Sequence, residues 1–236
     1  MIGLFVSDLH LFSRRSVGHD RWNELDLQSA SWLVLGGDIF DFRWSTLPDQ
    51  AATLDAARSW IENLIGLHPH LHIAYVTGNH DSHPAMRALL QEFSRSHSKF
   101  HWHEHTFRHE DKLFLHGDII DARPHSKGLE FYRNRFSVES KARGRLANLM
   151  YDTIVAMRAH QLPRHFVHRP QKILSRLYSC LVREGFVADR KLQKIFFGHT
   201  HVPMHGEFHR GYQFYNPGSA IRHLPFRPCS FECQQE

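Results

Sequence analysis

The stretch of sequence that decides the fold reads LVLGGDIFDF and covers residues 33–42. A short apolar run of the kind that forms a buried strand ends there in two glycines, and Asp38 and Asp41 follow. In α/β sheets, ligands bind at the carboxyl ends of the strands. We therefore expect a strand over residues 32–35 with a polar site at its end.

Four further segments share this design, and each of them follows an apolar run. A lone segment of this kind is usually a turn, because Asp and Asn beside glycine are common turn residues. Five segments in succession predict instead that their polar side chains converge on one crevice. The four segments are DLH at 8–10, GNHD at 78–81, HGD at 116–118 and GHTH at 198–201.

The spacing of apolar residues predicts the elements around these segments. Residues 51–67 have helical spacing, with Asp49 near the start, and alternation over 202–215 predicts closing antiparallel strands. Strand alternates with helix in the first part of the chain, which is typical of a mixed α/β (α+β) fold. Further strands are expected over residues 2–7, 71–76, 111–115 (entered through a hairpin turn) and 194–197.

Residues 122–193 interrupt this alternation and form a predicted insert in a core made of residues 1–121 and 194–236. Two amphipathic helices are expected within the insert, over residues 132–157 and 173–182. Residues 122–194 hold 16 Lys and Arg against 5 Asp and Glu, whereas the rest of the chain holds 13 against 19. This segregation of charge favours an anionic partner for the insert over a solvated helical pair.

The bulk composition excludes several classes of protein. Hydrophobic residues make up 42% of the 236 residues, but no apolar run approaches the roughly 20 residues that span a bilayer. Three cysteines form no paired framework and no signal-peptide pattern is evident, so we expect a reduced, cytoplasmic protein. A formal charge of +5 and 22 histidines point to an anionic partner and to metal binding.

The five polar segments offer carboxylate, carboxamide and imidazole groups and no thiolate. This donor set suits Mn²⁺, with Fe or Zn²⁺ as alternatives, rather than an iron–sulfur cluster. The five segments therefore predict a metal site in this crevice.

The order of the motifs, DxH, GDxxD, GNHD, HGD and GHTH, resembles that of the calcineurin-like metallophosphoesterase superfamily over residues 1–118 and 194–219. The resemblance implies a two-sheet αββα sandwich whose loops hold two divalent metal ions at one edge. It implies a two-metal hydrolase that acts on phosphoester or phosphoanhydride bonds, because two cations about 3.5–4 Å apart activate water and clamp the oxygens of a phosphate for in-line displacement. It also implies a role for each of seven residues: Asp8, His10 and His201 as ligands of the first metal, Asn79, His116 and His199 as ligands of the second, and Asp38 as the bridge between them.

The same resemblance implies that His80 faces the substrate and gives a hydrogen bond or a proton to the leaving group, while Asp41 orients its ring. From the residues alone, a structural role for His80 and a turn-capping role for Asp41 stay open. Asp118 is expected to support His116 rather than to touch a metal.

Within the superfamily, the segment GDIFDF with Trp44 and the basic helical insert most resemble the UDP-2,3-diacylglucosamine hydrolases of the lipid A pathway. Those enzymes cleave the pyrophosphate of a lipid-linked nucleotide sugar beneath a lid formed by the insert. The resemblance implies a cytoplasmic enzyme in peripheral contact with the inner face of the membrane. The candidate substrate contacts are Arg43, Trp44, Arg123 and Arg133. The chain departs from those enzymes at His80, where they carry arginine, so a paralogue with another substrate stays open.

Two readings from other classes also stay open. A nuclease would use the basic insert to follow a phosphate backbone. The insert aromatics follow apolar stripes, however, more than they form an exposed stacking platform. A non-catalytic scaffold would keep the fold without turnover, but relatives of that kind lose a ligand or the histidine at position 80, and this chain keeps them all.

Overall fold

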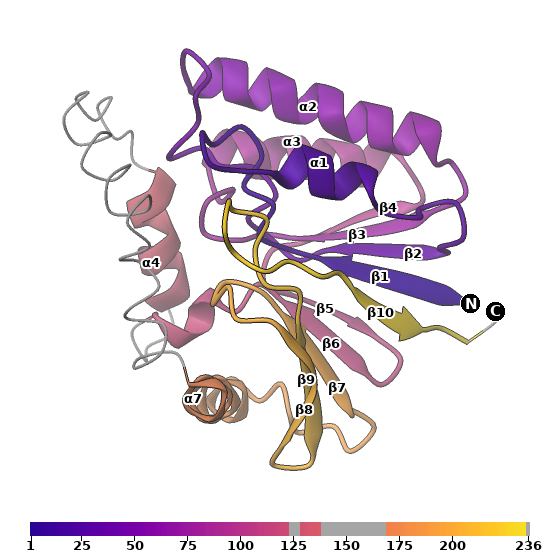
Figure 1. Cartoon of the computed structure of the whole chain (residues 1–236), viewed down its shortest axis with the longest axis vertical. Coiled ribbons are helices and arrows are strands. Elements are labelled where there is room, and N and C mark those ends of the chain that lie inside the picture. The colour runs from indigo at the N-terminus through magenta and orange to yellow at the C-terminus, as the bar shows by residue number, and fades with distance from the viewer. Residues whose placement is uncertain (123–127, 138–168, 235–236) are drawn as a thin grey trace.

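A computed structural model describes residues 1–122, 128–137 and 169–234. Two sheets are stacked face to face, with three helices outside the first sheet and helix α7 outside the second (Figure 1). This arrangement confirms the predicted two-sheet α/β sandwich. Arg123 and most of the helix predicted over residues 132–157 lie outside the described residues.

The first sheet has the strand order β10-β1-β2-β3-β4, in which β1 to β4 are parallel and β10 is antiparallel to β1. Parallel neighbours need crossover connections, and helices α1, α2 and α3 lie in those connections. The elements are β1 (Ile2–Val6), α1 (Gly18–Asn23), β2 (Trp32–Leu35), α2 (Gln50–Leu67), β3 (His72–Val76), α3 (Pro84–Ser96), β4 (Phe100–His103) and β10 (Cys229–Glu232).

Helix α2 confirms the helix predicted over residues 51–67. The side chain of Asp49 accepts a hydrogen bond of 2.8 Å from the backbone N–H of Ala52, which satisfies an amide that the first helical turn leaves without a partner. Ala57, Ile61 and Leu64 recur at helical spacing and are buried against the first sheet.

The second sheet has the order β5-β6-β7-β9-β8. Helix α7 (Pro170–Arg183) packs Leu174, Leu177 and Leu181 into the hydrophobic cluster of this sheet. The helix predicted over residues 173–182 therefore covers a sheet of the sandwich. The strands are β5 (Thr106–His109), β6 (Lys112–Leu115), β7 (Lys194–Phe197), β8 (Met204–His209) and β9 (Tyr212–Asn216).

Aromatic side chains fill the space between the two sheets. Phe5 from the first sheet lies 5.8 Å and 5.7 Å, between ring centroids, from Phe114 and Phe196 of the second. The rings of Phe114 and Phe196 stack at 4.8 Å. Large rings bury much apolar area at little rotamer cost, so this layer holds the two sheets in a fixed relation.

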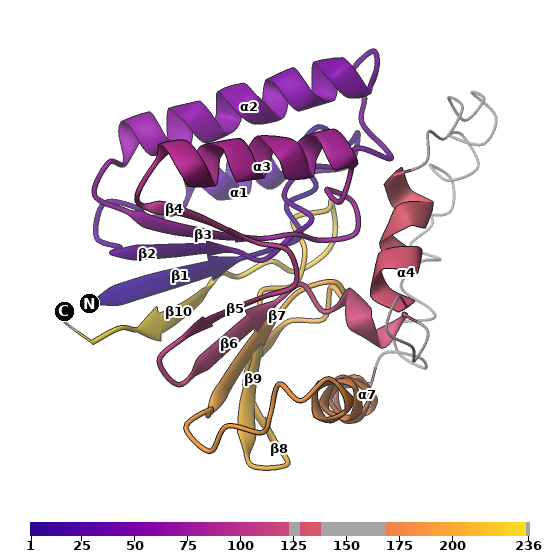
Figure 2. The ribbon, with the colours of Figure 1, turned by 180° about the vertical axis from the view of Figure 1, so that it is seen from behind.

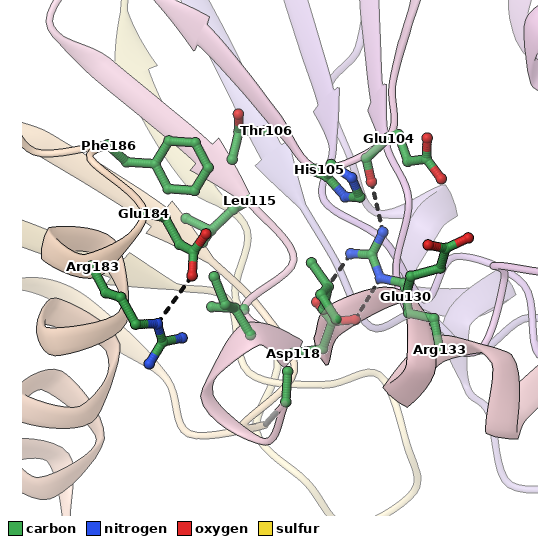
Figure 3. Close-up of a pocket in the computed structure, with 14 residues that line it drawn as sticks. Glu104, His105, Thr106, Leu115, Asp118, Glu130, Arg133, Arg183, Glu184 and Phe186 are labelled. Atoms are coloured by element: carbon green, nitrogen blue, oxygen red, sulfur yellow. Dashed lines mark hydrogen bonds and ion pairs between the residues drawn. The ribbon is translucent and has the colours of Figure 1, made fainter. Parts of the chain in front are cut away.

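Helix α4 (Gly128–Ser137) stands across the edge at which the polar segments lie (Figures 1 and 2). Its anchor is Arg133, of which 1% is exposed. The guanidinium donates to Asp118 through Nε at 2.7 Å and Nη2 at 3.0 Å, and to the carbonyl of Glu104 through Nη1 at 2.6 Å (Figure 3). A bidentate pair of this kind fixes both distance and orientation.

The Arg133–Asp118 pair bears on two expectations. Arg133, predicted as a substrate contact, is buried in an ion pair that ties α4 to the sandwich. Asp118, expected to support His116, does so through its charge, which helps to raise the pKa of that imidazole. The ring nitrogens of His116 contact Gly36, Asn79 and Asp38.

Within the described residues, no helix combines the length and the hydrophobicity that crossing a membrane requires.

We expect Arg133→Met to destabilise the fold by about 3–5 kcal/mol, because it leaves the buried Asp118 carboxylate without its charged partner. Chemical denaturation measures the free energy of unfolding. Arg135→Met is the matched control, since Arg135 is exposed on the same helix. An equal effect of the two substitutions would contradict the anchoring role of Arg133.

Candidate metal centre and active site

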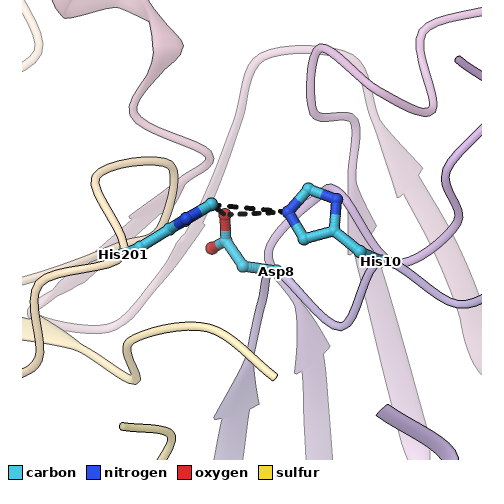
Figure 4. A group of neighbouring side chains, drawn as sticks. All are labelled: Asp8, His10 and His201. Atoms are coloured by element: carbon cyan, nitrogen blue, oxygen red, sulfur yellow. Dashed lines mark hydrogen bonds and ion pairs between the residues drawn. The ribbon is translucent and has the colours of Figure 1, made fainter. Parts of the chain in front are cut away.

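The first ligand group lies where β1 ends. Asp8 is fully buried, and its carboxylate accepts hydrogen bonds from Ser7 Oγ at 2.6 Å and from the backbone N–H of His199 at 3.0 Å. His201 Nε2 lies 3.2 Å from Asp8 Oδ1 and 3.4 Å from His10 Nε2 (Figure 4). Two imidazole nitrogens and a carboxylate oxygen thus face one point, and a cation there would satisfy all three.

The second group comprises Asp38, His116 and His199. His116 Nδ1 donates to the carbonyl of Gly36 at 2.9 Å, so a neutral His116 carries its lone pair on Nε2. That nitrogen lies 3.2 Å from Asn79 Oδ1 and 3.2 Å from Asp38 Oδ2. In this arrangement three acceptors face one another, and a cation between them would satisfy all three.

Asp38 belongs to the second group and also faces the first. Its Oδ2 is 3.2 Å from His116 Nε2 in the second group and 4.0 Å from His10 Nε2 in the first. Its Oδ1 accepts a hydrogen bond of 2.8 Å from the backbone N–H of His80, which fixes the carboxylate. The position is the one that a bridging ligand needs.

Charge at these groups favours a cation. Burial opposes ionisation, but the imidazoles of His116 and His80 outweigh it and lower the pKa of Asp38 well below its ordinary value. Burial likewise disfavours a charged His116, yet Asp38 raises the pKa of that imidazole to about 10. The carboxylate of Asp38 therefore stays ionised. It is stable there only if positive charge, on a protonated imidazole or on a metal ion, lies nearby.

The backbone at the ligands is held in an uncommon conformation. Left-handed φ angles are rare outside glycine and cluster at functional sites, where the surrounding structure imposes them. Gly78 and Gly198 leave room for the carboxylates, since a Cβ on either would overlap Asp38 or Asp8 respectively. Five of the seven predicted ligands have φ between 48° and 64°: Asp8, His10, Asp38, His199 and His201.

His80 and Asp41 form a pair beside the ligand groups. His80 Nδ1 lies 3.0 Å from Asp41 Oδ1, so the carboxylate orients the ring. Asp41 Oδ1 also accepts from the backbone N–H groups of Arg43 and Trp44, so it caps a turn as well. Burial works to lower the pKa of His80, but the charges of Asp41 and Asp38 raise it to about 9. Such an imidazole holds a proton at neutral pH.

Helix α4 forms one wall of this region. The ring of Phe136 lies 5.2 Å from that of His80, and the guanidinium carbon of Arg43 lies 4.8 Å from the Phe136 ring. Tyr132 lies 5.2 Å from Phe136 and 6.3 Å from His199, between ring centroids. Arg43 and Trp44, both predicted as substrate contacts, are half-buried beside this wall.

Three features of the site were not singled out from the sequence. Asp81 is fully buried and accepts hydrogen bonds from Ile39 N–H, Gly78 N–H and Tyr75 Oη, so it ties the loops after β2 and β3 together. The sequence indicates Asp81 only through its position as the last residue of the GNHD motif. The aromatics of α4 were expected on an apolar stripe, and only the fold brings Phe136 and Tyr132 close to His80 and His199. Asp121 contacts His199, with Oδ2 2.9 Å from Nε2.

Asp38→Asn is expected to lower the Mn²⁺ content below two ions per chain and to abolish turnover, because a carboxamide is a poor bridge between two cations. Elemental analysis and a phosphodiester assay measure the two effects. Asp55→Asn is the control, since Asp55 is exposed on α2. A variant that kept two ions and the parental rate would refute the bridging role.

Comparison with known proteins agrees with this geometry. Residues 4–203 match the family of calcineurin-like phosphoesterases, and that range contains all seven predicted ligands together with His80 and Asp41. A comparison with curated proteins gave no match. Because the matched range covers most of its length, the chain belongs to the calcineurin-like phosphoesterase family, whose members are metal-dependent hydrolases.

Proposed function

We propose that this protein hydrolyses a phosphoester or phosphoanhydride bond with two divalent cations held by the seven predicted ligands. The observation that carries the proposal is that Asp38 Oδ2, 3.2 Å from His116 Nε2 in its own ligand group, also lies 4.0 Å from His10 Nε2 in the other. When bound, the cations would activate water and stabilise charge on the phosphate oxygens. Oxygen and imidazole donors suit Mn²⁺, with Fe or Zn²⁺ as alternatives.

In this proposal, His80 delivers a proton to the leaving group. Its Nδ1 is held by Asp41, which leaves Nε2 as the nitrogen that faces the leaving oxygen. Arg43 lies on the ring of Phe136, next to His80, and would meet negative charge on the substrate beyond the cleaved bond.

We further propose a nucleotide-sugar lipid such as UDP-2,3-diacylglucosamine as the substrate, which the protein would bind while in peripheral contact with the inner face of the membrane. The resemblance of the GDIFDF segment and the basic charge of residues 122–194 support this choice. A cavity of about 280 Å³ beside α4 is lined in part by Leu115, Ile119 and Phe186 and in part by charged side chains such as Glu130 and Arg183, so it would meet an apolar group along only part of its wall (Figure 3).

A second candidate is a phosphodiesterase that acts on nucleotides or nucleic acid. Phe131 of α4 is 55% exposed, and Tyr132 and Phe136 on the same helix lie close to the ligands. Exposed rings beside a basic segment are typical of surfaces on which bases stack. These rings differ from the expected apolar stripe, and they favour testing a nucleic-acid substrate.

The decisive experiment is an Mn²⁺-dependent assay on five substrates: a small artificial diester, a monoester, a diacylated nucleotide sugar, its acyl-free analogue and single-stranded DNA. A much higher kcat/KM for the diacylated compound than for its acyl-free analogue would support the lipid substrate. Efficient cleavage of DNA with steep salt dependence would support the second candidate. Two bound cations without turnover of any compound would indicate a scaffold and overturn the proposal.

His80→Ala is expected to leave the metal content intact and to lower kcat by roughly 10²–10⁴-fold, because proton donation to the leaving group is lost. The loss should be smaller for a nitrophenyl ester, whose leaving group needs no proton. His19→Ala is the control, because His19 is exposed on α1. Equal losses for good and poor leaving groups would exclude proton donation as the role of His80.

A further inference from the structure

The carboxylate of Asp121 contacts a predicted metal ligand from outside the ligand groups. Asp121 directly follows the short 3₁₀ helix η1 (Asp118–Ile120), and its side chain is 42% exposed. Its Oδ2 lies 2.9 Å from Nε2 of His199. Among the described residues, the groups that could hold a metal include His199 but not Asp121.

This contact decides which nitrogen of His199 is free to bind a cation. A carboxylate only accepts hydrogen bonds, so Nε2 is the nitrogen that carries the proton. The lone pair of a neutral His199 is then on Nδ1. A carboxylate behind a ligating histidine fixes the tautomer and the ring orientation, and it makes the other nitrogen a stronger donor to the metal.

Asp121 is held in turn by α7. Arg176 Nη2 lies 3.2 Å from Asp121 Oδ1 and donates to the carbonyl of Ile120 at 2.9 Å. Arg176 is exposed, but the helix that carries it is not free to shift, because Leu174 and Leu177 on either side of it are fully buried. Solvent screens the attraction in this pair, so its effect is to set the direction of the Asp121 side chain.

We propose that Asp121 is a positioning residue for His199, and that Arg176 on α7 orients Asp121, so that the packing of α7 sets the affinity of the second cation. The inference rests on the proposed two-metal function. It assigns a role in metal binding to a helix that contributes no ligand. It also distinguishes the two cations, because Asp121 contacts His199 of the second group, whereas in the first group the ring of His10 faces Asp41, with Nδ1 3.4 Å from Oδ2.

The test is titration of the chelator-treated protein with Mn²⁺ by calorimetry. Asp121→Ala should weaken binding of one of two ions by about 10–100-fold and leave the other unchanged. Asp121→Asn, whose amide oxygen still accepts from Nε2, should recover part of the loss. Arg176→Gln should weaken the same ion by a smaller factor. The absorption spectrum of bound Co²⁺ should change in Asp121→Ala, since it reports the ligands directly.

Arg183→Gln is the matched control. Arg183 is also on α7, and it pairs with Glu184 at the surface rather than with Asp121. Two parental affinities in Asp121→Ala would overturn the role of Asp121, and a parental affinity in Arg176→Gln would overturn the role of α7. If the unaltered protein bound no divalent cation, the proposed function itself would fail, which is a different result. Thermal unfolding of each variant verifies that the fold persists.

Discussion

The structure depends on two buried carboxylates, Asp8 and Asp38, which need partners that their own strands do not supply. Asp8 accepts from the backbone N–H of His199, which follows β7 in the other sheet, and Asp38 accepts from that of His80. An ionised carboxylate away from water is stable only when hydrogen bonds and positive charge surround it. The loops that carry these residues must therefore lie close together. Their close approach requires the left-handed backbone at the ligands, and it leaves no room for a Cβ at Gly78 or Gly198.

Much of the sandwich could be predicted from the sequence, because its central strands are short apolar runs that end in polar motifs. Helix α2 was predictable for the same reason, with a capping Asp49 and a regular apolar stripe. Strand β5 was not, because its residues Thr106–His109 are mostly polar and pair only at an edge of the second sheet. Helix α3 was missed although it carries a signal, since Pro84 begins it and Met86, Leu89, Leu90 and Phe93 are buried on one face.

The predictable part of the site comprises the polar residues that directly follow predicted strands. The structure brings the seven predicted ligands and the His80–Asp41 pair to one edge, although whether they hold metal stays a prediction. The surroundings of the ligands were not predictable, because they arise from contacts between distant parts of the chain. Arg133 could be recognised as basic, but its burial against Asp118 follows from the docking of α4. The same holds for Asp121, whose partner His199 is 78 residues away.

The distance in sequence between Asp8 and its hydrogen-bond partners has a consequence for how the molecule is made. Asp8 is synthesised before its partners, because the backbone N–H of His199 that binds its carboxylate lies 191 residues later and the backbone N–H that binds its carbonyl belongs to Ala220. The loop that holds Asp8 therefore cannot make these contacts until residues 199 and 220 have been synthesised. Contacts so distant in sequence are slow to close, so we expect the loop that holds Asp8 to form late in folding. A nascent chain that stops short of His199 lacks two histidines of the centre, so capture of both cations would mark a polypeptide that has been synthesised past that point.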